Sequence, residues 1–351
     1  MNTRDLGTIP PYRPRRSPTD PDRGSRPLRL GSNENPLGPS PKAMRAVRAD
    51  AERMHRYPAR PHADLDTALA ERGGGDTEQI WLGAGGVSVI DTLTRAMVEP
   101  GEAILRPDPG FSYFGRSNRS HYGTERTYPL HREAGFDLDP TVLLEAYAGE
   151  PIVYLNTPHN PTGATVPMET VRTVVDGVDR DTLVVVDEAY GPFTDEPSMI
   201  ELVDETDQVG LIRTFSKTYG LAGARIGYGI LPTAVAGAYE RVSTPFGVSR
   251  LACTAALAAL DDTTYLERSV AVAREGRRFL HEALDPPTWP SEGNFVLIEV
   301  GDAHEVAARL ATHGLEVKDC TSFGLDDCIR ITVGTPEQNR RAVELVNRVV
   351  A

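Results

Sequence analysis

Lys217 lies in a segment, residues 213–229, whose other residues are suited to holding a phosphate group. Thr214 and Ser216 precede the lysine, and Arg225 follows it in a glycine-rich stretch. Arginine, hydroxyl groups and a glycine-rich turn together form good phosphate sites. Nearby cations and partial burial favour the neutral amine form of a lysine, which attacks carbonyl carbon. The segment therefore predicts a carbonyl-reactive lysine next to a phosphate site.

Three more polar residues, Asn160, Asp187 and Tyr190, follow apolar runs of the sequence. Asp187 ends the run Leu183–Asp187, Tyr190 comes three positions later, and Asn160 lies in a turn after residues 152–155. A carboxylate at the end of a buried strand is costly unless it is paired. Asp187 is therefore either the cap of the following turn or the counter-ion of a buried cation. Asn160 is either a plain turn residue or a rigidly held amide.

A glycine-rich turn, Gly83–Gly86, stands between an apolar run and a helix-like segment. The N–H groups at Ala84 and Gly85 and the dipole of the helix suit a phosphate, although such turns also occur as plain connections. A phosphate site, a buried acid, an amide, a phenol and an amine together suit an aldehyde-bearing phosphorylated pyridine. That compound is pyridoxal 5′-phosphate (PLP).

These residues need a scaffold, and the hydrophobic pattern predicts a mostly parallel sheet. From residue 79 onward, short apolar runs alternate with helix-like segments, which is typical of strands buried on both faces and joined by helical crossovers. Ligands of such sheets bind at the carboxyl ends of the strands, where the polar residues above are found. We expect helices at residues 87–98 and 112–121, and strands at residues 80–83, 103–106, 152–155, 183–187, 211–214 and 226–230.

The last hundred residues have a pattern typical of a smaller α+β unit, with helices over 250–284, 304–313 and from 336, and strands at 295–298 and 329–333. Residues 1–30 are rich in proline and arginine and lack apolar periodicity, so we expect a flexible N-terminal arm. The alternative is an arm that packs on a neighbouring subunit. The predicted domains are a large cofactor-binding domain, 45–248, and a small domain, 31–44 plus 249–351.

The composition argues against several classes of partner. The net charge of −13 disfavours nucleic acid, because a phosphate backbone requires a basic surface. No apolar run approaches the ~20 residues that span a bilayer, and no signal-peptide pattern begins the chain, so we expect no membrane partner. The cysteines, Cys253, Cys320 and Cys328, have no CxxC spacing. We therefore expect no metal site and a reducing, cytoplasmic location.

The sequence resembles the fold-type I PLP-dependent aminotransferases (classes I and II), and among them it is most similar to histidinol-phosphate aminotransferases. The resemblance runs from about residue 28 to the end of the chain. It implies an α/β fold like that of aspartate aminotransferase and an enzyme that transfers an amino group between an amine or amino acid and a 2-oxo acid. The matching segments are residues 31–41 (GSNENPLGPSP), 56–58 (RYP), 160–163 (NPTG), 187–190 (DEAY), 216–225, 315–319 (LEVKD) and 330–339 (RITVGTPEQN).

The resemblance also implies roles at the cofactor ring. Lys217 would attach to the aldehyde carbon and carry a proton between substrate and cofactor. Asp187 would pair with the ring nitrogen and keep it protonated, so that the ring accepts electrons. Asn160 and Tyr190 would hydrogen-bond the 3′ oxygen of the ring, and Phe111 would stack on its face.

The same resemblance implies that side chains and backbone N–H groups from both ends of the site hold the cofactor phosphate. These are Arg225, Ser216, Thr214 and the backbone at Ala84 and Gly85. Tyr57 would reach this phosphate from a partner subunit, which implies a homodimer with shared active sites.

Arg330, Lys318 and Asn35 are expected to bind the substrate, with histidinol phosphate as the leading donor and 2-oxoglutarate as the second substrate. In histidinol-phosphate enzymes an arginine usually stands at the position of Lys318 and helps the residue at position 330 grip the substrate phosphate. Lysine lacks the bidentate fork of arginine. Gly85-Gly86 also replaces a commonly acidic pair, and Leu37 replaces a frequent aromatic residue.

These departures leave other functions open. A transaminase for an aromatic or other amino acid would use Arg330 to hold an α-carboxylate. A related PLP-dependent phosphothreonine decarboxylase would share the Asn-Asp-Lys-Arg set. A remote alternative is a non-catalytic PLP-binding regulator, although such proteins normally carry an added DNA-binding domain.

Overall fold

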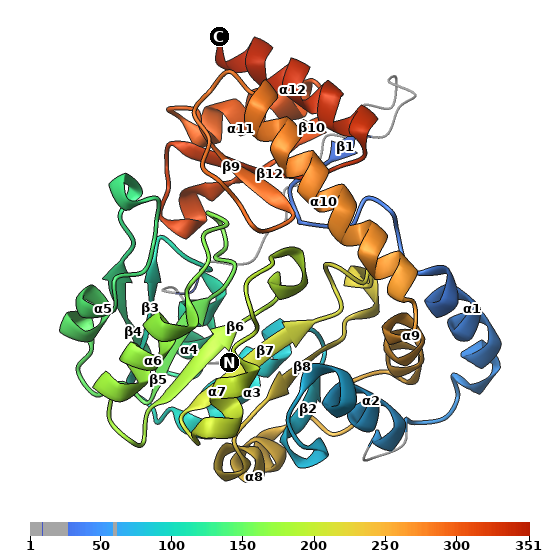
Figure 1. Ribbon diagram of the computed structural model, residues 1–351, viewed down its shortest axis with the longest axis vertical. Coiled ribbons are helices and arrows are strands. Elements are labelled where there is room, and N and C mark those ends of the chain that lie inside the picture. Colours follow the sequence, from blue (N-terminus) through green and yellow to red (C-terminus); the bar gives the residue numbers. More distant parts are fainter. Residues whose placement is uncertain (1–8, 10–26, 59–61) are drawn as a thin grey trace, which may run out of the picture.

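The computed structural model describes residue 9, residues 27–58 and residues 62–351. A seven-stranded sheet with the strand order β2-β8-β7-β6-β5-β3-β4 forms its centre (Figure 1). Its pairs are parallel except for the two that β8 makes. The predicted mostly parallel sheet is therefore confirmed. Its strands are β2 (Ile80–Gly83), β3 (Ala103–Asp108), β4 (Thr124–Pro129), β5 (Ile152–Asn156), β6 (Leu183–Asp187), β7 (Val209–Thr214) and β8 (Gly227–Ile230).

Helices cover both faces of this sheet, because alternate residues of each central strand point to opposite sides. In β6, Val184 and Val186 pack into one core, and Leu183 and Val185 pack into another. The first core holds α1 (Pro41–Asp50), α2 (Ala63–Gly73), α5 (Pro140–Ala146), α6 (Met168–Gly177), α7 (Ile200–Glu205) and α9 (Arg250–Leu260). The second holds α3 (Gly86–Met97), α4 (Tyr113–Ser120) and α8 (Thr233–Val242).

A smaller unit follows along the chain and lies above the sheet in Figure 1. Its antiparallel sheet has the order β11-β12-β9. Three helices, α10 (Thr263–Ala283), α11 (Ala303–Thr312) and α12 (Pro336–Val350), pack against it around a separate core. The strands are β9 (Phe295–Glu299), β11 (Lys318–Asp319) and β12 (Cys328–Thr332), and β1 (Leu28–Arg29) pairs in parallel with β10 (Leu315–Glu316) beside them.

The predicted boundary of the N-terminal arm at residue 30 is wrong. Leu28 and Leu30 are buried in the core of the smaller unit. Their N–H groups donate to the carbonyls of Gly314 and Glu316, each at 2.8 Å. A two-residue strand, Leu28–Arg29, followed by one more buried leucine is too short a pattern to be read from the sequence alone. Residues 1–8 and 10–26 of the predicted arm lie outside the described residues.

Helix α9 also packs differently from the prediction. Its alanines Ala252, Ala255, Ala256 and Ala259 are buried in the core of the large sheet, together with Ala43 of α1. These small side chains let the two helices approach closely. The smaller core therefore begins after α9 rather than at residue 249.

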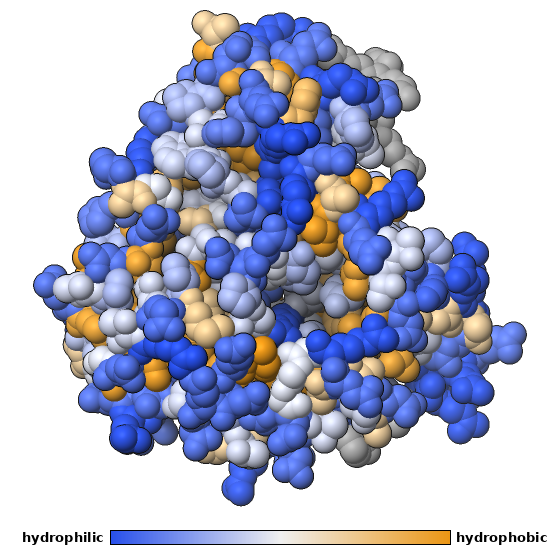
Figure 2. Space-filling model, viewed as in Figure 1, coloured by the Kyte–Doolittle hydropathy of each residue, from blue (hydrophilic) through white to orange (hydrophobic). Residues whose placement is uncertain are grey.

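The face shown in Figure 2 is mostly hydrophilic and is hollowed between the smaller unit and the large sheet. Across the described part of the chain, no helix has the length and apolar character needed to traverse a bilayer.

Candidate active site

Several of the predicted cofactor residues lie at one edge of the large sheet. Asp187 and Thr214 end the parallel strands β6 and β7. The antiparallel strand β8 starts at the same edge, so Arg225 lies beside them just before it. The turn after β2 meets this edge as well, because Gly83 pairs with Gly227. Strand direction alone thus assembles residues that are far apart in the sequence.

Lys217 lies in the connection between β7 and β8. Its Nζ donates to the carbonyl of Ser32 at 3.0 Å and lies 5.8 Å from the ring centroid of Tyr190. Burial, helped by the nearby cations Arg330 and Arg225, lowers the pKa of this amine to about 7, against the opposing effect of nearby carboxylates. A large fraction of the amine is therefore neutral near pH 7, the form that attacks a carbonyl carbon.

Asp187 is buried at the end of β6. Its Oδ1 accepts from the N–H of Ala189 at 2.9 Å, and its Oδ2 accepts from Nδ2 of Asn156 at 3.4 Å. Burial, together with the charge of the neighbouring Glu188, raises the pKa of this carboxyl to about 7. The N–H of Ala189 and the amine of Lys217 act in the opposite direction. A buried acid of this kind suits a cationic partner such as a protonated ring nitrogen.

The turn at residues 83–86 and Arg225 form a cradle for an anion. Gly85 has φ +84° and precedes α3, and a Cβ at this position would collide with the guanidinium of Arg225. Arg225 donates to the carbonyls of Ala222 at 2.9 Å and Ala84 at 3.2 Å. The hydroxyls of Thr214 and Ser216 lie 2.9 Å apart. The set fits a phosphate group, because a helix N-terminus, a guanidinium and two hydroxyls all donate to oxygen.

Tyr190 and Asn160 are held by residues of the smaller unit and the N-terminal segment. Nδ2 of Asn33 donates to the hydroxyl of Tyr190 at 2.8 Å. Oδ1 of Asn160 accepts from Nη1 of Arg330. The sequence did not single out Asn33, although it lies within the motif at residues 31–41.

Arg330 and Lys318 lie side by side, because they are directly paired between β12 and β11. Arg330 is buried between the rings of Phe295 and Phe323, 5.1 and 5.7 Å from their centroids. Its Nη2 donates to the carbonyl of Gly31 at 3.1 Å. Its Nε has no hydrogen-bond partner among the described residues. Lys318 lies 4.7 Å from the ring centroid of Phe323 and donates to the hydroxyl of Ser322 at 3.1 Å.

Asn35, which is predicted to contact the substrate, makes several contacts with protein groups. Its Nδ2 donates to the backbone carbonyls of Lys217 at 3.2 Å and Thr218 at 3.0 Å, and to the hydroxyl of Ser269 at 2.6 Å. Its Oδ1 accepts from the N–H of Leu37 at 3.0 Å. Both ends of the amide thus contact protein groups, among them the backbone of Lys217.

Phe111 and Tyr57 are the two aromatic residues predicted to contact the cofactor. Phe111 packs edge-on against Phe114, with ring centroids 5.5 Å apart and planes at 88°. Tyr57 is 75% exposed and stacks on Phe246, itself 45% exposed, at 4.4 Å. Among the described residues, no cluster of three or more metal-binding side chains occurs.

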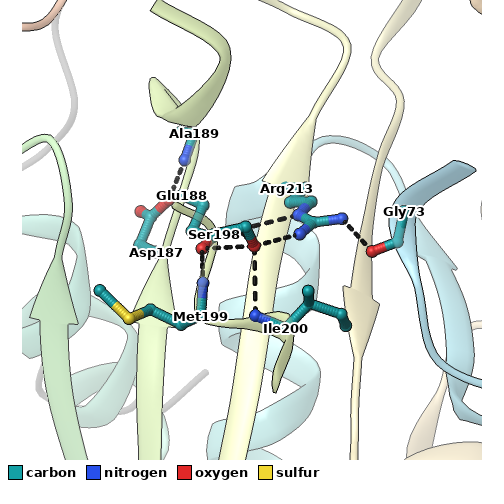
Figure 3. Close-up of polar contacts among 8 residues, drawn as sticks. All are labelled: Gly73, Asp187, Glu188, Ala189, Ser198, Met199, Ile200 and Arg213. Atoms are coloured by element: carbon teal, nitrogen blue, oxygen red, sulfur yellow. Dashed lines mark hydrogen bonds and ion pairs between the residues drawn. The ribbon is translucent and has the colours of Figure 1, made fainter. Parts of the chain in front are cut away.

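A buried ion pair, missed in the sequence, lies directly behind Asp187. Figure 3 shows Arg213 of β7 pointing toward Glu188, Ser198 and the end of α2. Nε of Arg213 donates to Glu188 at 2.8 Å, and its other nitrogens donate to the hydroxyl of Ser198 at 2.6 Å and the carbonyl of Gly73 at 2.8 Å. The N–H of Met199 donates to the same carboxylate at 2.7 Å. The pair thus joins β6, β7 and α2 beneath the site.

Replacing Arg213 with methionine is expected to lower the free energy of unfolding by about 3 kcal/mol, because it leaves the carboxylate of Glu188 buried without a counter-ion. The double variant Arg213→Met with Glu188→Gln should lose less than the single variant. Urea unfolding measures both. Arg274→Met, which removes the exposed pair with Asp195, is the matched control and should have a much smaller effect. Equal losses for Arg213→Met and Arg274→Met would contradict the prediction.

Comparisons with known proteins agree with this geometry. Residues 25–346 match the family described as Aminotransferase class I and II. A curated histidinol-phosphate aminotransferase of Haloferax volcanii is 49% identical, with 100% of this chain and 99% of that protein covered. One from Methanosarcina mazei is 42% identical, covering 90% of this chain and 86% of that protein.

Solved structures have the same architecture. A histidinol-phosphate aminotransferase from Sinorhizobium meliloti in complex with PLP has a TM-score of 0.85 and 31% identity, with 92% of this chain and 90% of that chain covered. Aspartate aminotransferase from Thermus thermophilus, solved with maleate, has a TM-score of 0.82 at 24% identity over 93% of this chain and 92% of that one, which shows the shared fold. By family match, full-length similarity and a site that fits the cofactor, the chain belongs to the class I and II aminotransferases and is a PLP-dependent transaminase.

Proposed function

We propose that the chain transfers an amino group between histidinol phosphate and a 2-oxo acid, with 2-oxoglutarate as the partner acid. The observation that carries this proposal is the pairing of Lys318 with Arg330, which places two cations side by side at the site. A substrate phosphate requires such a concentration of positive charge and donors, and the hydroxyl of Ser322 adds one more. Relatives named as histidinol-phosphate aminotransferases support the same substrate.

PLP would supply an acceptor for the electron pair that remains when the donor loses its Cα proton. In our proposal the neutral amine of Lys217 takes that proton from the substrate and later delivers it to the former aldehyde carbon of the cofactor. Asp187 would pair with the ring nitrogen and keep it protonated, since a buried carboxylate favours a cationic neighbour. Asn160 and Tyr190 would hydrogen-bond the 3′ oxygen of the ring, and Phe111 would cover its face.

The cofactor phosphate is assigned, in the same proposal, to donors at the far end of the site. Arg225 supplies charge, Thr214 and Ser216 supply hydroxyls, and the backbone at Ala84 and Gly85 supplies N–H groups at the start of α3. These groups would hold the phosphate end of the cofactor, and Lys217 would attach to its aldehyde carbon.

The proposed assembly is a homodimer with shared active sites. Tyr57 and Phe246 form an exposed aromatic pair, which is typical of a surface that another subunit covers. In this arrangement Tyr57 reaches the cofactor phosphate of the partner. A sedimentation mass equal to that of one chain would contradict the assembly. The three unpaired cysteines support the proposed cytoplasmic location.

The substrate is tested by the half-reaction of the purified holoenzyme, followed by the absorbance of the cofactor. Histidinol phosphate should convert the cofactor at far lower concentration than histidinol, which lacks the phosphate. Aspartate and aromatic amino acids complete the panel of donors. Faster conversion by an α-amino acid would favour the alternative in which Arg330 holds a carboxylate.

Replacing Lys318 with methionine is expected to lower kcat/KM for histidinol phosphate by about 10²-fold, since a hydrogen bond to a charged group contributes about 1.5–3 kcal/mol. The same variant should leave the slow reaction of histidinol unchanged. Lys318→Arg, which keeps the charge and adds a fork, is the matched control and should retain activity. An equal loss for both donors would show that Lys318 does not contact the phosphate.

A further inference from the structure

Two buried polar atoms behind the site have no hydrogen-bond partner among the described residues. They are Oδ1 of Asn156 and Nε2 of His159, in side chains that are 5% and 3% exposed. Both residues line one small cavity, whose other walls are mainly apolar and include Tyr128, Phe136 and Val166. A buried polar atom without a partner is costly, so two at one cavity call for a common ligand.

The cavity has the size and chemistry for a single water molecule. Its interior accommodates roughly one water, the minimum for an ordered site. The amide oxygen of Asn156 accepts a hydrogen bond. Burial lowers the pKa of His159 to about 3, although the carbonyl of Pro109 opposes the fall, so the ring is neutral and keeps one N–H. Nδ1 of His159 lies 2.8 Å from the hydroxyl of Thr162, which leaves Nε2 for the cavity.

Asn156 connects this cavity to Asp187. The two residues are direct neighbours in the pairing of β5 with β6, and Nδ2 of Asn156 points to Oδ2 of Asp187 at 3.4 Å. The two ends of one amide therefore face the carboxylate and the cavity. A donor at one end of an amide becomes stronger when the oxygen at the other end is itself hydrogen-bonded.

We infer that a buried water bridges His159 and Asn156, and that this relay makes Asn156 a positioning residue for Asp187, holding its carboxylate ionised against the ring nitrogen of PLP. The other charged or titratable groups that act on Asp187 are Glu188, which opposes ionisation, and Lys217, which favours it. Asp187 in turn acts on the phenols of Tyr154 and Tyr190. The relay adds a neutral donor on the side of the carboxylate that faces β5.

The relay is tested on the holoenzyme before any amino donor is added, so the outcome does not depend on the proposed substrate. A crystal structure that resolves buried waters should show one within hydrogen-bond distance of both Asn156 and His159. With ¹⁵N-labelled PLP, the resonance of the ring nitrogen should report its deprotonation as the pH rises. Asn156→Leu should lower the midpoint by about one pH unit, a tenfold change in proton affinity.

Replacing His159 with phenylalanine removes only the far partner of the water. It should lower the proton affinity of the ring nitrogen roughly threefold, and the pH midpoint should fall accordingly. Val166→Ala enlarges the cavity without removing a polar group and should leave the midpoint unchanged. An unchanged midpoint in both Asn156→Leu and His159→Phe would overturn the relay. So would a dry cavity in the crystal structure, a result that stands even if Asn156→Leu does not fold.

Discussion

Replacing Lys217 with alanine is expected to lower kcat by at least about 10⁴-fold, because the variant loses both the covalent hold on the cofactor and the group that moves the proton. The protein should still fold and bind PLP, since Arg225, the hydroxyls of Thr214 and Ser216 and the N-terminus of α3 are untouched. Single-turnover absorbance measurements would show the cofactor present but unconverted by the donor. Full turnover in Lys217→Ala would contradict the assigned role.

The sequence makes this test unusually sharp, because the chain has only the lysines Lys42, Lys217 and Lys318. Borohydride reduction of the holoenzyme followed by peptide mass analysis should place the cofactor on Lys217 alone. Lys42, whose amine donates to the carbonyl of Asp261 at the surface, is the natural control, and Lys42→Ala should leave turnover unchanged. A label on Lys318 instead would place the reactive aldehyde at the wrong end of the site.

The positions of the reactive side chains could be predicted because these side chains lie at or just after the ends of strands. An apolar run that stops at Asp187 or just before Lys217 shows both where a buried strand ends and what it presents there. Parallel strands bring such ends to one edge whatever their order in the sheet. Strand β4 is not predicted because it is not an apolar run. Its sequence, TERTYP, is polar, and its exposure alternates at the margin of the sheet.

The supporting contacts could not be predicted, since they depend on register and on residues far apart in the chain. Asn156 contacts Asp187 only because β5 and β6 align with that register. Arg213 meets Glu188 across β7 and β6, and Asn33 reaches Tyr190 across 157 positions of sequence. In the sequence each of these is an ordinary polar residue near a turn. Identifying these residues as supporting contacts requires knowledge of how the strands pair, which the motifs alone do not determine.

Replacing Asp187 with asparagine is expected to lower kcat about 10³-fold. The ring nitrogen of the buried cofactor would lose its carboxylate partner, and breaking one side of a buried charge pair costs about 3–5 kcal/mol. The amide has nearly the shape of the acid, so the fold and the contact with Ala189 should persist. Asp181→Asn, an exposed change just before the same strand, is the control and should have no effect. Steady-state rates with saturating PLP separate loss of chemistry from loss of cofactor.

Although Asp187→Asn should lower kcat, it should raise the stability of the apoprotein at high pH. The folded pKa of Asp187, about 7, lies above its ordinary value of 3.8. The contribution of this group to stability is therefore complete below about pH 4 and is lost as the pH rises through 7. The amide that replaces the carboxyl cannot ionise, so apo Asp187→Asn should be more stable than the wild-type apoprotein at pH 8, by up to about 4 kcal/mol, with a much smaller difference at pH 5. Urea unfolding at the two pH values measures this.

With PLP bound, the order should reverse, because the ionised carboxylate then has its cationic partner and the amide does not. A variant that is less stable than the wild type in the apo form at pH 8 would mean that Asp187 is not desolvated there, and the proposed pairing would lose its physical basis. If both orders hold, a single carboxylate destabilises the apoprotein and stabilises the holoenzyme. That sign change is expected of a residue retained for the chemistry of the cofactor and not for the fold.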